Sequence, residues 1–312
     1  MGRVIGFVLV GAGAFLIALA PLLRFQVADR LIAAPADQYS VTTLRADNAR
    51  YFNVGDLKVL DGTLDITVTV KGDVEQASGD RVVWDQFTAV NDVTNNKQGI
   101  SMSQFRSAFN KYTGEGLNCC GVNVDKEPVA LDGQIFLFPF NAEKKTYKVF
   151  NSVTAKAFDA RFVGEDVVEG LPVHKYEQVI PPTKTQTITA PASVVGVKDK
   201  TGDVKVDRWY DGKITFWVEP TSGVPVKQEQ QRHEVLKTQD GVERKPALVA
   251  TATYTPEAVD EWVRTATNAR NQITLLKTTI PLVLLVVGVV LLAAGVLFAL
   301  RGGRSARHAA DS

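Results

Sequence analysis

The sequence predicts an α+β protein in which a mostly antiparallel β domain lies between an N-terminal and a C-terminal transmembrane helix. Apolar runs at residues 4–23 and 278–300 predict the helices, because each can span ~30 Å of hydrocarbon and neither contains a charged side chain. Between the runs, several segments alternate apolar and polar residues, which is typical of strands with one buried face.

The first apolar run has an alternative interpretation as a cleaved signal peptide. Arg3, the apolar run and the small residues around Ala20 match the three regions of such a peptide. Pro21 disfavours cleavage, and the run exceeds the usual ~7–15 apolar residues. We therefore expect an uncleaved helix, and either interpretation exports the following domain.

Basic residues beside the runs predict the orientation. Arg301, Arg304 and Arg307 follow the second run and Arg3 precedes the first, which places both ends in the cytoplasm. We expect a plasma-membrane protein with two spans and a large extracytoplasmic domain. The predicted parts are a cytoplasmic N-terminus at 1–3, a transmembrane helix at 4–23, a β-rich domain at 24–277, a second transmembrane helix at 278–300 and a cytoplasmic tail at 301–312.

The charge balance argues against nucleic acid as a partner. The chain has 35 basic and 34 acidic residues, for a formal net charge of +1, and basic residues form no cluster interleaved with aromatics. The middle segment has an ordinary globular composition and is long enough to bury a sizeable core.

The middle segment contains the signals of an antiparallel sheet. Apolar residues alternate from Leu64 to Val70, and Asp61-Gly62 before them predicts a hairpin turn. Further turns are predicted at Asp211-Gly212 and at residues 220–223. Further strands are predicted at residues 81–90, 135–138, 145–149, 173–180, 208–218 and 224–234.

Helices are predicted inside the domain and beside each membrane run. Residues 101–112 predict a helix, because apolar residues including Met102 and Phe109 recur on one face. Thr255 is a candidate cap of a helix whose apolar stripe includes Trp262, expected at the foot of the sheet. This helix could continue into the second span, with a kink at Pro281.

Glycines within the spans predict a close contact between the two membrane helices. Gly6 and Gly13 in the first run, and Gly288 and Gly295 in the second, would allow the helix backbones to approach each other. Oligomerisation is the alternative use of these small residues.

The two cysteines of the chain, Cys119 and Cys120, are adjacent. In an oxidising exterior they could form a strained ring, pair between chains or remain thiols. We predict a disulfide that rigidifies the loop between Gly116 and Gly121, with a redox role as the alternative.

The sequence contains no recognisable catalytic or cofactor-binding motif. The three histidines, His174, His233 and His308, form no ligand pair at helical spacing, and the adjacent cysteines do not make a zinc site. Nucleophile elbows, phosphate-binding loops and dinucleotide fingerprints are missing. We expect no catalytic residues, no cofactor and no metal, and therefore a protein that is not an enzyme.

The overall layout resembles that of the actinobacterial PorA-like family, whose members are described as porins or as membrane proteins of unknown function. The resemblance rests on the two terminal runs, residues 136–140, Gly164-Glu165, Gly170-Leu171-Pro172-Val173 and Tyr176, and it covers nearly the full length. It implies a link to lipoglycan synthesis in the cell envelope, with envelope-biosynthesis proteins as partners.

Two weaker resemblances point to lipid. Residues 132–140 and 170–176 are similar to a stretch of class B scavenger receptors, which pass lipids through a tunnel in a β-rich domain between two membrane helices. Residues 217–226 are similar to a hairpin of bacterial lipoprotein-carrier domains. The chain differs from the receptors in its single adjacent cysteine pair and its lack of an Asn-x-Ser/Thr site.

These observations predict a two-span envelope protein whose exported domain binds or passes lipid or lipid-linked glycan. The alternative is a scaffold without a ligand that organises envelope-biosynthesis enzymes. Phe136, Phe138 and Phe140 are candidates to line an apolar cavity, or else to fill the core.

Overall fold

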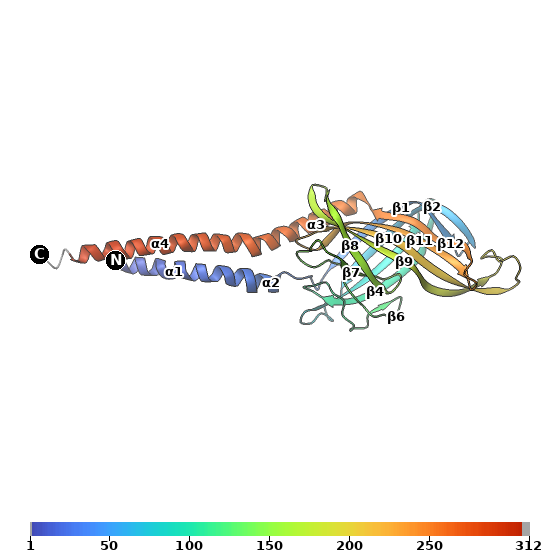
Figure 1. Ribbon diagram of the computed structural model, residues 1–312, viewed down its shortest axis with the longest axis horizontal. Helices are drawn as coiled ribbons and strands as arrows, with labels where there is room; N and C mark the ends of the chain where they lie inside the picture. Colours follow the sequence, from blue (N-terminus) through green and yellow to red (C-terminus); the bar gives the residue numbers. More distant parts are fainter. Residues whose placement is uncertain (1, 308–312) are drawn as a thin grey trace. The chain divides into compact units, whose positions relative to one another are not determined.

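The computed structural model describes residues 2–307 and comprises two compact units (Figure 1). One unit contains the helical ends of the chain, before Ala34 and after Thr267, and the other contains Ala34–Thr267. Met1 and residues 308–312 of the predicted cytoplasmic ends, including His308, lie outside the described residues.

The first unit contains one long helix and most of a second, and the ranges of these helices contain both predicted transmembrane helices. Helical stretches at Arg3–Leu31 and Pro256–Arg301 are long and apolar enough to cross a membrane. Each stretch is helical throughout, with one π-helical turn. The segments are α1 (Gly2–Leu22), the π-turn η1 (Leu23–Val27) and α2 (Ala28–Leu31), then α3 (Pro256–Thr274), the π-turn η2 (Leu275–Thr279) and α4 (Ile280–Arg307).

Glycines bring α1 and α4 into close contact, as predicted. A Cβ atom added to Gly13 would lie 2.6 Å from the carbonyl oxygen of Gly288, and one added to Gly6 would lie 2.9 Å from that of Gly295. Both distances are too short for real atoms, so only glycine allows this approach. The contact is intramolecular, which confirms the first of the two uses expected for these residues.

The π-turn η2 lies where the sequence predicts a kink. Pro281 lacks the amide hydrogen that the carbonyl of Lys277 would accept, and its ring crowds that carbonyl. A π-turn directly before the proline widens the helix and accommodates the mismatch without ending it. Lys277 in this turn also pairs with Asp29 of α2 at 2.8 Å, which links the two helices.

The second unit contains one antiparallel sheet of twelve strands, so the predicted fold class is confirmed. In the sheet the strands follow the order β6-β5-β4-β3-β2-β1-β12-β11-β10-β9-β8-β7. Strands that are consecutive in sequence are neighbours in the sheet, except β6 and β7, which form its two edges, and β1 also pairs with β12. The strands are β1 (Tyr39–Asn53), β2 (Lys58–Gly72), β3 (Arg81–Asp92), β4 (Lys97–Asn110), β5 (Asn123–Val124), β6 (Glu127–Pro128), β7 (Tyr147–Asn151), β8 (Lys156–Val168), β9 (Leu171–Pro191), β10 (Asp203–Glu219), β11 (Val224–Thr238) and β12 (Glu243–Tyr254).

The prediction of a helix at residues 101–112 is wrong, because most of this segment forms β4. Phe105, Ser107 and Phe109 occupy alternate positions and are buried, and the strand pairs along its length with β3. Phe105 and Phe109 are four residues apart, a spacing that fits both a helical period and a strand period. Pairing with β3 decides between the two.

The predictions of turns at the two Asp-Gly pairs are also wrong, because each glycine lies inside a strand. A Cβ atom on Gly62 of β2 would lie 2.6 Å from the Asp92 carboxylate, and one on Gly212 of β10 would collide with the backbone carbonyl oxygen of Gln231. Gly62 therefore makes room for a side chain, and Gly212 makes room for the backbone of the neighbouring strand. The turn predicted at residues 220–223 is confirmed between β10 and β11, and residues 135–138 form a loop rather than the predicted strand.

The sheet is curled so that strands from its two ends approach each other (Figure 1). Phe105 of β4 stacks on Phe150 of β7, with ring centroids 5.5 Å apart. Bridges from Phe109 to Gly116, from Glu115 to Gln134 and from Gln134 to Val149 connect β4 to β7. At this end the connecting segment therefore closes the curl.

Candidate functional site

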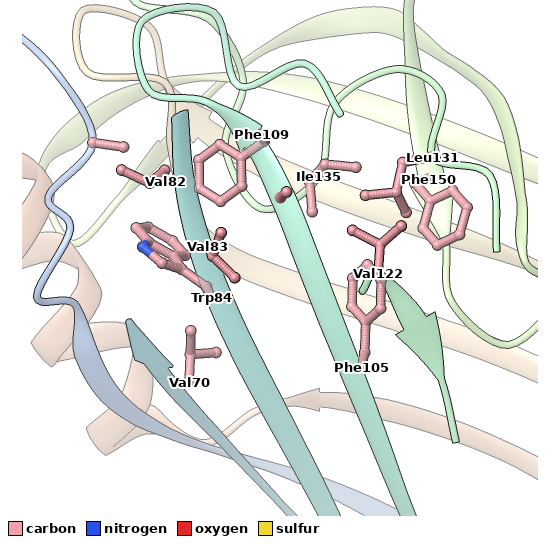
Figure 2. Close-up of a cluster of buried hydrophobic side chains, with 12 residues drawn as sticks. Val70, Val82, Val83, Trp84, Phe105, Phe109, Val122, Leu131, Ile135 and Phe150 are labelled. Carbon is pink, nitrogen blue, oxygen red and sulfur yellow. The ribbon is translucent and has the colours of Figure 1, made fainter. Parts of the chain in front are cut away.

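The predicted phenylalanines lie at the closed end of the curl. Phe136 packs against Trp84, Phe105 and Phe109 of β3 and β4, with centroid distances from 5.4 to 6.0 Å. These three rings belong to the buried cluster shown in Figure 2, which also contains Phe150. Phe136 thus fills space within one aromatic cluster.

Phe138 lies in a second cluster, formed by the other half of the sheet. Its ring stacks on Tyr176 of β9 at 4.6 Å and meets Phe216 of β10 at 5.7 Å. It is 3% exposed, whereas Phe140 is half-buried. Phe136 and Phe138 are close in sequence but contact opposite halves of the curled sheet. The sheet face that carries their aromatic partners is therefore the concave face.

Away from this packed end, the concave face retains accessible apolar side chains. Register places Ile66 and Val68 of β2 and Val90 of β3 on the same face as Trp84. They are only partly buried against the neighbouring cluster. Interior side chains that solvent still reaches make this part of the face a candidate contact surface for an apolar ligand.

An ionic cluster lies on the concave face of β10 and β11. Glu234 is 1% exposed and accepts hydrogen bonds from two arginines, Arg208 at 2.7 Å and Arg232 at 3.0 Å, each through its Nε. Burial alone would raise the pKa of Glu234, but the two guanidinium groups outweigh burial and hold the pKa below its usual value. Arg232 also lies over the ring of Tyr210, 5.7 Å from its centroid.

Sequence reasoning missed this cluster, because residues on both faces of its strand are polar. Gln228, Gln230, Arg232 and Glu234 occupy alternate positions of a strand that the sequence predicts correctly. Residues at this spacing share one face, and here that face is the concave one. Because the structure shows that this face is interior, its row of polar side chains indicates a polar site.

Asp92 of β3 has a separate buried position. Its carboxylate accepts hydrogen bonds from the Tyr51 hydroxyl at 2.7 Å and from the Asn95 side chain at 2.7 Å. Burial opposes the charge on Asp92, but these bonds hold its pKa below the usual value. Burial and the bond to Asp92 together raise the pKa of Tyr51 to about 12. The pair ties β1 to β3 across Gly62.

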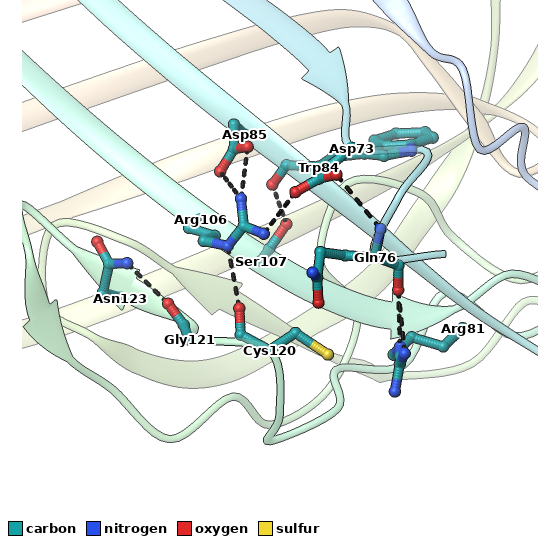
Figure 3. Close-up of polar contacts among 10 residues, drawn as sticks. All are labelled: Asp73, Gln76, Arg81, Trp84, Asp85, Arg106, Ser107, Cys120, Gly121 and Asn123. Carbon is teal, nitrogen blue, oxygen red and sulfur yellow. Dashed lines mark hydrogen bonds and ion pairs between the residues drawn. The ribbon is translucent and has the colours of Figure 1, made fainter. Parts of the chain in front are cut away.

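The cysteine loop is held to β4 by Arg106, as Figure 3 shows. Arg106 donates to the carbonyl oxygen of Cys120 at 3.0 Å, to Asp85 at 2.7 Å and to Asp73 at 2.6 Å. Cys119 and Cys120 are free thiols in the structure, so the predicted disulfide is not confirmed. An arginine fork, rather than a disulfide, fixes the position of this loop.

Trp262 lies against the sheet, in the position expected from the sequence. Its indole nitrogen donates to the Thr42 hydroxyl of β1 at 2.9 Å, and its ring packs against a buried cluster that contains Val226 of β11 and Val259 of α3. The predicted cap of α3 is also present, because the Ala258 amide donates to the Thr255 hydroxyl at 3.3 Å. The first turns of α3 are thus fixed to the sheet.

Comparison with known proteins gives a consistent result. The family model described as Porin PorA matches residues 5–297. A Porin PorA of Corynebacterium amycolatum is 26% identical over 194 residues, which cover 49% of this chain and 50% of that protein. A Porin PorA of Corynebacterium resistens is 25% identical over 244 residues, or 58% of this chain and 59% of that protein.

The matched part spans between half and three fifths of the length of these curated relatives. The family match covers nearly the whole chain, from within the first apolar helix to within the second. Together, the family match and the two apolar helices identify a membrane protein of the cell envelope. This chain belongs to the Porin PorA family.

Proposed function

We propose that the β domain is exported and that it binds or passes lipid or lipid-linked glycan in the cell envelope, without catalysing a reaction. The observation that carries this proposal is the accessible apolar surface on the concave face, formed by Ile66, Val68 and Val90. An acyl chain lying on this face would gain about 25 cal/mol for each Å² of apolar surface removed from water.

The proposed topology places both chain ends in the cytoplasm and two spans in the plasma membrane. Two apolar helices that contact each other through Gly13 and Gly288 support a pair of spans. The helices would anchor the β domain on the outer surface, where lipids in transit between envelope layers can be reached.

A pair of substitutions at neighbouring residues tests lipid binding. Val90 lies on the concave face, whereas Ala89, the preceding residue, lies on the convex face. With the full chain purified in a mild detergent, mass spectrometry should detect a co-purified long-chain lipid. Val90→Trp should lower its occupancy severalfold because the larger ring fills the surface, and the control Ala89→Trp should leave it unchanged. Equal occupancy in both variants, or no lipid in the wild type, would contradict the proposal.

A scaffold for envelope-biosynthesis enzymes is the second candidate function. It is favoured by exposed apolar side chains on the convex face of β1 to β4, of which Tyr39 and Met102 are 68% and 63% exposed. Cross-linking in intact cells distinguishes the two functions. A scaffold should lose its cross-linked partners in Met102→Lys and keep them in Val90→Trp, whereas a lipid carrier should respond to Val90→Trp.

The name of the relatives, Porin PorA, also brings a pore into consideration. Gly13 and Gly288 bring the backbones of the two described apolar helices into direct contact, which leaves no room for water between them. A pore would therefore need several copies of the chain. Ion flux through liposomes that contain the purified protein measures this directly, and we expect none above the background of empty liposomes.

A further inference from the structure

The ionic cluster on the concave face carries one more positive than negative charge. One carboxylate oxygen of Glu234 accepts bonds from Nε and Nη2 of Arg232, at 3.0 and 2.5 Å. The other accepts from Nε of Arg208 at 2.7 Å and is 2.6 Å from its Nη2. Two guanidinium groups therefore share a single carboxylate.

This surplus charge is placed where solvent compensates it poorly. The Glu234 side chain is 1% exposed and the Arg232 side chain 20%, while Arg208 is 36% exposed. Within residues 2–307, Glu234 is the only carboxylate that forms an ion pair with either arginine. A partly buried cation without its own counter-ion is stabilised by an anion that binds beside it.

The geometry leaves guanidinium donors available for such an anion. Both arginines contact Glu234 through Nε and Nη2, so the Nη1 group of each points away from this carboxylate. The residues paired with Arg232 on the neighbouring strands are Gly212 and Ala250, which are both small. The Tyr210 ring holds the Arg232 guanidinium from one side.

The surroundings suit the polar end of an amphiphile. Gln228 and Gln230 precede Arg232 on the same face of β11 and are half-buried, which adds neutral hydrogen-bond donors beside the charge. Planar guanidinium groups recognise phosphate and carboxylate through paired N–H donors. The chemistry of this cluster therefore selects an acidic oxygen group.

We propose that Arg232 and Arg208 bind the anionic group, a phosphate or carboxylate, of the amphiphile held by the concave face. This inference rests on the proposed lipid binding and adds the chemical class of the head group. It predicts that the domain distinguishes acidic from neutral lipids.

Single arginine substitutions test the proposal without unpairing Glu234. In Arg232→Gln, Arg208 still neutralises the buried carboxylate, so the fold should persist and a thermal melt checks this. The control Arg50→Gln removes an equal charge from a 60% exposed convex position. The probes are dioleoyl phosphatidate, dioleoylglycerol and inorganic phosphate, each titrated against the full chain in a non-ionic detergent.

The wild type should bind phosphatidate about tenfold more tightly than dioleoylglycerol, and Arg232→Gln should remove most of this preference. Arg50→Gln should keep it. Equal affinity of wild type and Arg232→Gln for phosphatidate would overturn the anion site and leave lipid binding intact. If neither lipid binds, the proposed function fails, and the phosphate titration decides about the anion site. Phosphate binding that weakens in Arg232→Gln would identify a site for free anions. Phosphate binding that is absent, or that is unchanged in Arg232→Gln, would overturn the anion site as well.

Discussion

At the scale of single residues, Asp92 keeps a charge in a buried position. Four hydrogen bonds hold the carboxylate, from the Tyr51 hydroxyl, the Asn95 side chain and the backbone amides of Thr94 and Asn95. The bonds compensate for lost hydration and fix the turn after β3. The stability of this region should therefore depend on pH.

Asp92→Asn should lower the free energy of unfolding at pH 7 by about 1–3 kcal/mol, because the charged acceptor is lost. The folded pKa of Asp92 lies below its unfolded value of 3.8, so its charge stabilises the fold above that pH. This contribution is lost as the pH falls through the folded pKa. Urea unfolding at pH 7 and pH 3 should show that the difference in free energy of unfolding between wild type and variant is smaller at pH 3. Asp37→Asn, at an exposed position, is the control, and a difference that stays constant would contradict the assignment.

Arg106 and the cysteine loop give a second prediction at this scale. Burial, together with a hydrogen bond that the thiol donates to Cys119, raises the pKa of Cys120 above its usual value, so little thiolate is present at pH 7. Alkylation by iodoacetamide should be slow there and accelerate above pH 9. In Arg106→Gln the loop loses its anchor, and the rate at pH 7 should rise severalfold.

The same experiment tests the predicted disulfide. With free thiols, as in the structure, alkylation proceeds without a reductant. A requirement for reductant in freshly isolated membranes would restore the disulfide, and a non-reducing gel would separate a ring within one chain from a cross-link between chains. An unchanged rate in Arg106→Gln would show that the loop is held by other contacts.

At the scale of elements, the contact between α1 and α4 depends on glycine at defined positions. Gly6 faces Gly295 and Gly13 faces Gly288, which places the pairs seven residues apart along each helix. Seven residues are close to two helical turns, so both pairs lie on one face. Gly11, which lies between Gly6 and Gly13 in α1, has nothing within 4 Å of an added Cβ atom.

Gly13→Leu should therefore separate the helices, whereas Gly11→Leu should be tolerated. The overpacked variant should lose about 1–3 kcal/mol of stability, because the added side chain meets backbone atoms that cannot rotate away. Thermal unfolding in detergent measures the loss, and energy transfer between dyes on the two helices measures their separation. Similar effects of the two substitutions would contradict the packing.

At the scale of the whole molecule, the proposed topology can be tested with reporters. A reporter fused after Ser312 should be cytoplasmic, because basic residues after the second span are retained inside. A reporter inserted at Asn96, in the exposed turn between β3 and β4, should be external. An external C-terminus, or a mature protein that begins after Ala20, would contradict the arrangement with two anchors.

Local patterns were sufficient to predict the two membrane helices, the start of α3 and half of the strands, namely β2, β3, β7, β9, β10 and β11. The apolar runs predict helices because length and hydrophobicity are properties of a continuous segment. The alternation from Leu64 to Val70 predicts β2. Thr255 predicts the start of α3, because its hydroxyl accepts a hydrogen bond from the amide of Ala258, only three residues further along the chain. These features depend on neighbours in sequence, and the structure retains them.

Tertiary contacts decided the rest. The apolar residues of 101–112 fit both a helix and a strand, and only pairing with β3 makes this segment β4. Gly62 and Gly212 imitate turn residues, yet the Asp92 carboxylate and the Gln231 carbonyl oxygen require glycine at these strand positions. The pairing of β1 with β12 joins residues about two hundred positions apart, which no local pattern specifies.

The candidate site was hidden for the same reason. The sequence shows Arg208, Arg232 and Glu234 as ordinary charges on strands, and only the register of β10 with β11 places them together. Which face of the sheet is interior depends on the curl, and contacts between distant segments such as Phe105 with Phe150 determine the curl. The sequence by itself determined the anchors and the sheet, whereas the tertiary structure decided which side chains face inward, because burial depends on neighbours that are distant in the chain.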